Sequence, residues 1–529
     1  MAIDNNEAFP LPFDSSLREA SVQFSWKLPL SIVIFVLCIS PTLVSYTPYS
    51  FRWDDSDYLW RSIAVSRAFW TGNSHDLRAA MVSIRPPIMT FLGLPWGPLT
   101  SWDGAGKCFI TITALTALFV ACCLFLLLRV GIKLRYLVIA GVCAFAALGP
   151  YFASADARMF PTGFMADSLF AWIALAATLL IPHETATRRS STTESIARGV
   201  LWATIFLAGA MTKVSFLYFI VLVLPIVFFI RMRRSGFSNA FVALISLGVC
   251  SLPVAIYYLR YGQIALKNGF AASFGHDAPL YYVSLSQFLT DTVRDSPGIL
   301  LSVTLTVAGL VYLLIKHRDA AWSINALALL IMLGYCATTL ASSNRDIRYS
   351  FSAFIAIPFL IAILLSRDAY VSSQRLAIIS AVFVFCCLVA AGVPMLHRPN
   401  RQSIHLAEVA LAQAADSNAK RVLLATDSST LNNSLMSVAI VVSASPAQVE
   451  AETLAWRAAS GVPAEADVPD IRESDLVVFQ NSEALDSPIT NQRVSKYEQY
   501  ARQRFGDAPI KVIDGLRIYG KSQIDPRKP

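Results

Sequence analysis

The chain has 529 residues, of which 55% are hydrophobic and only 15% are charged, and its formal net charge is +8. A typical soluble domain carries about 25% charged residues, so this chain has too few charges to cover a soluble globule of its size. The composition excludes a cytosolic or disordered protein and predicts a polytopic α-helical membrane protein with a soluble part.

Apolar segments recur along the first three-quarters of the chain. A membrane-spanning helix needs about 20 mostly apolar residues, and the sequence predicts eleven, near residues 28–47, 108–128, 136–155, 164–182, 199–212, 215–230, 239–259, 298–315, 322–342, 350–366 and 376–396. The fifth and sixth are short and meet at Thr212 and Lys213, which favours a re-entrant hinge over two full spans. The nine cysteines lie in or beside these segments, so we interpret them as small hydrophobic residues.

Basic residues gather in the short loops on one side of the predicted spans. By the positive-inside rule that side is the cytoplasm. Residues 1–27 are then a cytoplasmic segment, and 28–396 are the transmembrane domain, in which 48–107 form the first outer, or periplasmic, loop. Residues 397–529 form a periplasmic domain with nearly balanced charges. The positive charge is thus a topology signal, which argues against a nucleic-acid partner.

The first periplasmic loop opens with an acidic segment, Trp53-Asp54-Asp55-Ser56-Asp57-Tyr58. Three carboxylates within four residues repel one another unless something uses them. In a helix, Asp54, Asp57, Tyr58 and Arg61 would share one face. Five tryptophans in the same loop indicate helices that lie in the membrane interface. The alternative is an acidic loop that is merely solvated.

Other charged residues lie near the same membrane surface. Two prolines fix the backbone after Arg85 and present this cation at the interface. Asp167 lies a few residues inside the fourth predicted span, where an intramembrane carboxylate is a candidate functional group. Lys213 and the Arg348-Tyr349 pair could join Arg85 around a phosphate, which needs charge-assisted donors. Taken singly, each is explained as a structural turn, a helix cap, an ion pair or a snorkelling side chain.

Histidine spacing does not predict a zinc site, because no two histidines have ligand spacing on one helix. A divalent metal ion is the one cofactor that the sequence leaves open. Its candidate ligands are Asp54, Asp55 and His276.

The C-terminal part alternates predicted strands with predicted helices. Strands are expected at 421–427, 437–443, 475–481 and 510–520, and helices near 403–415, 447–458 and 491–505. This order predicts a small α/β domain with a partly parallel sheet. No strand is followed by a glycine-rich phosphate loop, which argues against nucleotide binding there.

The order of these motifs resembles that of a known class of enzymes. Asp54-Asp55-x-x-Tyr58 followed by Arg85-Pro86-Pro87-Ile88 is similar to the first-loop signature of GT-C membrane glycosyltransferases. The nearest branch looks like the bacterial protein O-mannosyltransferase-like and aminoarabinose or galacturonic acid transferases. The resemblance continues through three further segments: Ala166-Asp167-Ser168-Leu169, Ala210-Met211-Thr212-Lys213, and Arg348-Tyr349 with Pro358.

The resemblance implies an inverting transfer of one sugar from a polyprenyl-phosphate donor. The acceptor on the periplasmic side would be lipid A or another glycolipid, a polysaccharide or a protein. We expect Asp54 to act as general base, while Asp55 orients the acceptor or a metal and Asp167 holds the acceptor or the loop. The remaining candidates are expected to bind the donor phosphate (Arg85, Lys213, Arg348, Tyr349) or the substrate (Asp57, Tyr58, Arg61).

Two other functions share some of these features. A lipid-linked sugar transporter would need charges in mid-membrane and usually two related halves, and the sequence has neither. An oligosaccharide ligase or polymerase would share the outward site and its cations. Only the identity of the donor separates that ligase from a monosaccharide transferase.

Overall fold

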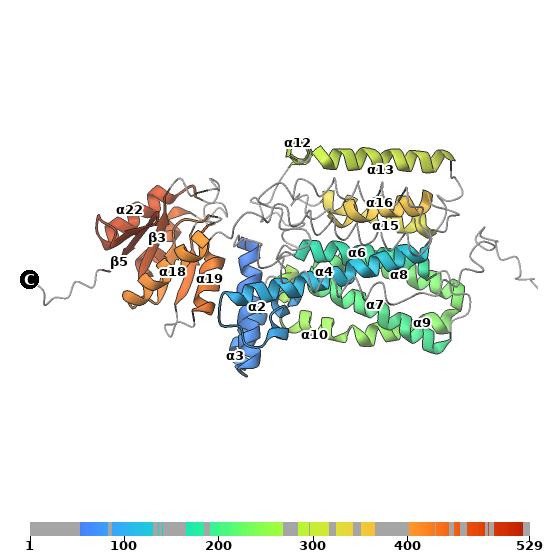
Figure 1. Ribbon diagram of the computed structural model, residues 1–529, viewed down its shortest axis with the longest axis horizontal. Coiled ribbons are helices and arrows are strands. Elements are labelled where there is room, and N and C mark those ends of the chain that lie inside the picture. The colour runs from blue at the N-terminus through green and yellow to red at the C-terminus, as the bar shows by residue number, and fades with distance from the viewer. Residues whose placement is uncertain are drawn as a thin grey trace, which may run out of the picture.

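The computed structural model describes residues 53–82, 87–130, 136, 140, 166–184, 191–267, 284–295, 297–316, 324–341, 351–365, 401–428, 430–443, 449–454, 463–481, 485 and 491–521. Three parts follow one another along its long axis (Figure 1). A bundle of long helices occupies one end and a small α/β domain the other. Between them, helices α2 (Trp53–Trp70) and α3 (Ser74–Met81) run across the end of the bundle.

The bundle is built around one helix that is apolar on every side. Helix α6 (Ala166–His183) is buried from Leu169 to Ile181 and contacts neighbours on all sides, as expected for the centre of a bundle. Its neighbours and the remaining bundle helices are α4 (Asp103–Val130), α7 (Thr192–Thr212), α8 (Ser215–Ser235), α9 (Phe237–Cys250), α10 (Leu252–Arg260), α12 (Leu285–Asp295), α13 (Pro297–Lys316), α15 (Ile324–Ala341) and α16 (Phe351–Leu365).

Several of these helices could cross a membrane by length and composition. Within the described residues, three single helices are long and apolar enough, namely Asp103–Cys123 of α4, all of α7, and Ser215–Arg233 of α8. Helices α9 and α10 pass the same test as a pair bent by 42°. The bend falls beside Pro253 in the first turn of α10, where a missing N–H interrupts the helical hydrogen bonds. The predicted spans 28–47 and 376–396, and nearly all of 136–155, lie outside the described residues.

The predicted re-entrant hinge between the fifth and sixth spans is wrong. Helices α7 and α8 have 21 residues each and lie side by side. Helix α7 begins at Thr192, well before the apolar segment, because the side chain of Ser191 accepts a hydrogen bond from the Glu194 N–H and caps it. The polar first turns conceal this extension from a search for apolar runs.

Helices α7 and α9 pack closely through Gly199. A Cβ atom at this position would collide with the main-chain oxygen of Ala243 and lie 2.6 Å from Ser246 Cβ. Small residues allow such close backbone approach between apolar helices. We expect Gly199→Ala to destabilise the protein by about 1–3 kcal/mol through overpacking, measured as a lower Tm in detergent. Gly248→Ala in α9 is the matched control, because nothing lies within 4 Å of its added Cβ; equal Tm changes would contradict this account.

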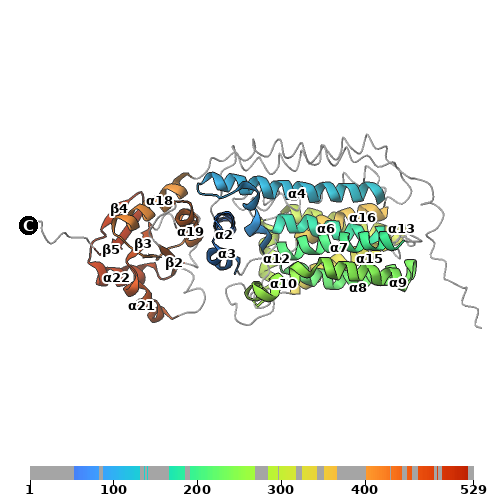
Figure 2. The ribbon, with the colours of Figure 1, turned by 90° about the horizontal axis from the view of Figure 1, so that it is seen from below.

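The C-terminal domain contains a five-stranded mixed sheet in the order β2-β1-β3-β5-β4. Strands β2 (Glu450–Thr453), β1 (Arg421–Leu424) and β3 (Leu476–Gln480) are parallel, and β5 (Leu516–Gly520) and β4 (Lys511–Ile513) form an antiparallel hairpin. The hairpin turns at Asp514 and Gly515, which both have positive φ, as a two-residue turn of this kind requires. Helices α18 (Arg401–Asp416), α19 (Asn433–Val442), α21 (Val468–Glu473) and α22 (Val494–Phe505) cover the sheet (Figure 2).

Two elements predicted in this domain are wrong. The segment 437–443 forms most of helix α19 instead of a strand, since Asn432 caps its start by accepting from the Leu435 N–H at 2.9 Å. An unbroken apolar run fits a buried helix as well as a buried strand. Residues 450–453, expected to be helical, form β2. This strand pairs with β1 alone, so its polar sequence suits an edge position.

Helix α19 docks the C-terminal domain on α2. The two helices are in contact, and Nη1 of Arg67 in α2 donates to the main-chain oxygen of Val441 at 3.0 Å. Carbonyl groups in the last turn of a helix lack partners within that helix, and a cation there also meets the negative end of the helix dipole. A second link runs from Trp102 Nε1 to Glu408 Oε1 of α18 at 3.1 Å.

Tyr497 in α22 should make the folded protein less stable at alkaline pH. It is buried and donates to Asp467 Oδ2 at 2.7 Å. Burial raises the pKa of Tyr497, and the bond to the Asp467 carboxylate raises that pKa further. The folded chain therefore keeps this proton at pH values where the unfolded chain loses it. The raised pKa of Tyr497 adds to the free energy of unfolding. This gain is fully present below about pH 10 and is lost as the pH rises above that value.

We expect the Tm of the wild-type protein to fall between about pH 10 and pH 12, and to fall less steeply in Tyr497→Phe. The variant has a lower Tm at neutral pH because it loses a hydrogen bond, so the slope and not the absolute Tm is compared. Parallel slopes for the two proteins would contradict the assignment.

Candidate active site

Helix α2 carries the acidic segment. Asp54 and Asp55 lie in its first turn, and the positions of their side chains are outside the described part of the chain. Carboxylates near a helix N-terminus gain about 0.3–1 kcal/mol from the helix dipole. This gain is small, so the dipole offsets only part of the repulsion between neighbouring carboxylates. The predicted helical face is present, since the α-helix runs through Asp54, Asp57, Tyr58 and Arg61.

One turn later, Asp57, Trp60 and Arg61 form a compact polar cluster. Asp57 Oδ1 accepts from Trp60 Nε1 at 3.1 Å and from Arg61 Nε at 3.2 Å. The Arg61 guanidinium also lies 4.5 Å from the centre of the Trp60 ring. The Asp57 and Arg61 side chains are mostly buried. Asp57 thus fixes one edge of Arg61, and the guanidinium is held in a defined orientation.

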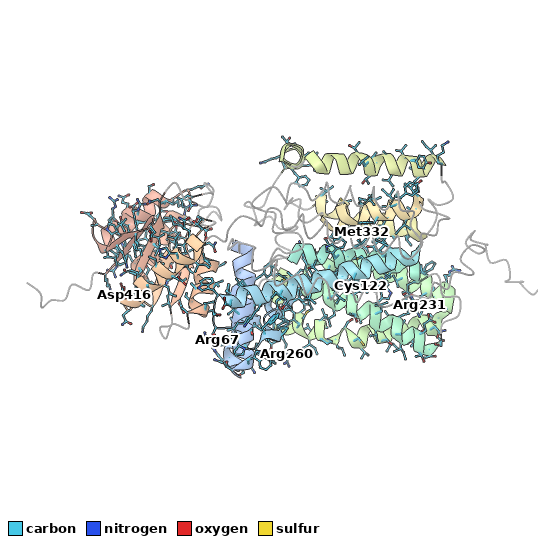
Figure 3. All side chains as sticks on the ribbon, viewed as in Figure 1. Arg67, Cys122, Arg231, Arg260, Met332 and Asp416 are labelled. Atoms are coloured by element: carbon cyan, nitrogen blue, oxygen red, sulfur yellow. The ribbon has the colours of Figure 1, made fainter. Side chains whose placement is uncertain are left out.

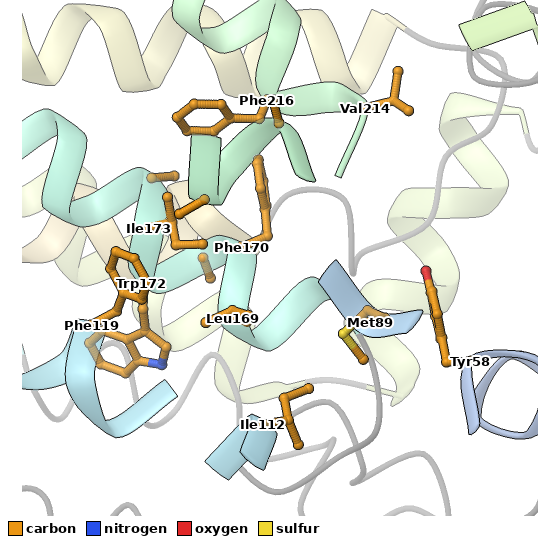
Figure 4. Close-up of a cluster of buried hydrophobic side chains, with 14 of the residues drawn as sticks. Tyr58, Met89, Ile112, Phe119, Leu169, Phe170, Trp172, Ile173, Val214 and Phe216 are labelled. Carbon is orange, nitrogen blue, oxygen red and sulfur yellow. The ribbon is translucent and has the colours of Figure 1, made fainter. Parts of the chain in front are cut away.

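Tyr58 points into the bundle. It is only 5% exposed and belongs to the same buried cluster as Met89 of the 3₁₀ helix η1 (Pro87–Phe91) (Figure 4). The cluster also includes Phe170 of α6 and Val214 and Phe216 at the start of α8. Tyr58 therefore anchors α2 to the end of the bundle, a role that its place in the motif does not reveal.

Lys213 occupies the corner between α7 and α8. It has extended φ and ψ values of −154° and 133°, and its N–H closes α7 by donating to the oxygen of Gly209. Its Nζ lies 5.6 Å from the ring centre of Phe170. Only Val214 separates it from the first residue of α8. The corner places an ammonium group at the end of the bundle that α2 crosses.

A pair of tyrosines in α10, Tyr257 and Tyr258, adds to this end of the bundle. The Tyr258 hydroxyl donates to the main-chain oxygen of Ala210 at 2.6 Å, three residues before Lys213. Sequence reasoning missed both tyrosines, because they lie within a predicted span; two adjacent tyrosines near the end of an apolar run are the signal that was available.

Several predicted site residues lie outside the described part of the chain, namely Arg85, His276, Arg348 and Tyr349. Asp167 is the second residue of α6, and its side chain is also outside that part. Among the described side chains, no three His, Cys, Asp or Glu residues are grouped as metal ligands would be. The structure thus joins Asp57 and Arg61 through a hydrogen bond, with Tyr58 beside them on α2. Lys213 lies separately, at the corner between α7 and α8, and the proposed metal ligands stay a prediction.

No family model and no curated protein sequence matches the chain. Among solved structures, ArnT from Cupriavidus metallidurans in the apo state is similar over 93% of this chain and 97% of that chain, with a TM-score of 0.53 and 12% identity. A structure of the same ArnT bound to undecaprenyl phosphate covers 85% of this chain and 92% of that chain, with a TM-score of 0.49 and 12% identity. An identity this low shows the fold alone. The chain has a GT-C, aminoarabinose-transferase-like fold, as its ordered motifs predict.

Proposed function

We propose that the protein is an inverting GT-C glycosyltransferase of the bacterial inner membrane. It takes one sugar from a polyprenyl-phosphate donor and passes it to an acceptor on the periplasmic side. The observation that carries this proposal is the position of α2, which bears the acidic segment and runs across one end of the bundle (Figure 1). Tyr58 of α2 lies at the same end as Val214 and Phe216, which follow Lys213 at the start of α8 (Figure 4). A general base and a phosphate-binding cation are the two groups that such a transfer needs.

In the proposed reaction, Asp54 takes the proton of the acceptor hydroxyl as its oxygen attacks the anomeric carbon. The new carbon–oxygen bond forms on the face opposite the phosphate, and the bond to the phosphate oxygen breaks. That oxygen keeps the electron pair, so negative charge grows on the leaving polyprenyl phosphate. Lys213, with Arg85 and the Arg348-Tyr349 pair, stabilises this charge in the transition state. Asp55 and Asp167 orient the acceptor and the loop.

The test is mass spectrometry of polyprenyl-linked sugars and envelope glycans in a strain that lacks the protein. We expect one polyprenyl-phosphate monosaccharide to accumulate and a single glycan modification to disappear, and the wild-type gene to reverse both changes. Accumulation of an oligosaccharide on a pyrophosphate carrier would instead identify a ligase or polymerase. Unchanged pools of lipid-linked sugar would refute the proposed donor class.

A further inference from the structure

Tyr257 has a hydroxyl group that the fold does not use. The residue lies in α10 and is only 5% exposed, and its hydroxyl oxygen has no hydrogen-bond partner among the residues that the structure describes. More than nine in ten buried polar groups in native proteins are paired. A rigidly held, unpaired hydroxyl next to a candidate site therefore indicates a group that a ligand satisfies.

The ring of Tyr257 is held firmly on two sides. It meets the Tyr258 ring edge-on, with 5.3 Å between the ring centres, and the Tyr261 ring at 6.2 Å. Tyr258 itself is attached to the end of α7 through its bond to Ala210. The Tyr258 hydroxyl therefore joins α10 to α7, whereas the Tyr257 hydroxyl has no partner among the described residues.

The surroundings of this hydroxyl suit an anion. Arg61 lies one turn after Tyr58, which belongs to the same buried cluster as Tyr257, and the Asp57 carboxylate orients the Arg61 guanidinium through Nε. This bond engages one of the five N–H donors of the guanidinium. A phenol O–H and a guanidinium are both donors that make strong hydrogen bonds to phosphate oxygens.

We propose that the Tyr257 hydroxyl donates a hydrogen bond to the phosphate of the polyprenyl-linked donor, with Arg61 contacting the same phosphate. The inference rests on the proposed function and deepens it, because it adds a buried phenol to the cations expected around the leaving group. The same contact serves the sugar-bearing donor and the free polyprenyl phosphate that remains after transfer.

The test is binding of polyprenyl phosphate, with the uncharged polyprenol as comparison, to the full-length protein in detergent. We expect the wild type to bind the phosphate more tightly than the alcohol, and Tyr257→Phe to bind the phosphate about 10- to 100-fold more weakly. The Tm of the unliganded variant should not fall, because the lost hydroxyl had no partner. Tyr258→Phe is the matched control; it loses the bond to Ala210, so its Tm falls without a comparable loss of phosphate affinity.

Each outcome decides a different point. Equal phosphate affinity of the wild type and Tyr257→Phe overturns this inference and leaves the proposed function intact. A Tm drop in Tyr257→Phe as large as in Tyr258→Phe also overturns it, because the hydroxyl would then be structural. A wild-type protein that does not distinguish polyprenyl phosphate from polyprenol overturns the donor class and the inference together. Additive affinity losses in Arg61→Gln and Tyr257→Phe would refute the shared contact.

Discussion

Replacing Asp54 by Asn should lower the turnover number by about 10²- to 10⁴-fold, the contribution typical of a positioned general base. The amide has the size of the carboxyl group but cannot take a proton from the acceptor hydroxyl. Asp54 lies in the first turn of α2, so the exchange removes only the small gain from the helix dipole. The measurement is sugar transfer by purified protein, with the Tm recorded to show that the variant is folded.

Asp57→Asn is the control, because this carboxylate lies on the same helix and already accepts hydrogen bonds from Trp60 and Arg61. Its loss should act through the orientation of Arg61 and mainly raise the KM for the donor. Wild-type turnover of folded Asp54→Asn would contradict the assignment of Asp54 as the base. A loss of turnover in Asp57→Asn as large as in Asp54→Asn would show that the acidic segment acts as a structural unit.

Replacing Arg231 by Met should lower the free energy of unfolding by about 3 kcal/mol. A buried carboxylate, Glu184, loses its closest partner and keeps the more distant Arg198, whose Nη1 lies 3.6 Å from Glu184 Oε1. The Glu184 side chain is fully buried, and its Oε2 accepts from Arg231 Nη1 at 2.6 Å while Oε1 accepts from Trp202 Nε1 at 3.0 Å. Arg231 also donates to Ser195. This network joins the turn after α6 to α7 and α8, at the end of the bundle far from Arg67 (Figure 3).

Chemical unfolding in detergent measures this loss. Arg233→Met is the matched control on the same helix, since Arg233 is exposed and stacks on Phe229; it should change stability by less than about 0.5 kcal/mol. Adding Glu184→Gln to Arg231→Met should recover part of the loss, because the double variant buries no unpaired charge. A double variant as unstable as the sum of its single exchanges would refute the ion-pair account.

Much of the architecture could be predicted from patterns that act over short distances. Apolar length locates the cores of α4, α6, α13, α15 and α16, and the tryptophans of the first loop predict helices in that loop. Motif order leads to the fold that the comparison with ArnT shows. These features are encoded by residues that are close together in sequence, so single-sequence reasoning reaches them.

The rest depends on partners that are distant in the sequence. Arg231 looks like one of the loop cations that set topology, yet it is buried against a glutamate 47 residues away. Helix α19 has the composition of a strand, but its Asn432 cap and its contact with α2 make it a helix. The motif predicts a substrate contact for Tyr58, but it does not predict that Tyr58 is buried in one cluster with Met89 of η1. The sequence around these residues shows no repeating hydrophobic or charge pattern that would reveal the contacts.

The docking of α19 on α2 bears on the order of biosynthesis. A ribosome synthesises residues 53–70 long before residues 433–442. Helix α2 is therefore synthesised before the helices of the bundle, and α19, which packs on it, is synthesised after all of them. Contacts of such high sequence separation form slowly. If the acidic segment catalyses the proposed transfer, activity would then appear only after the C-terminal domain has folded against α2.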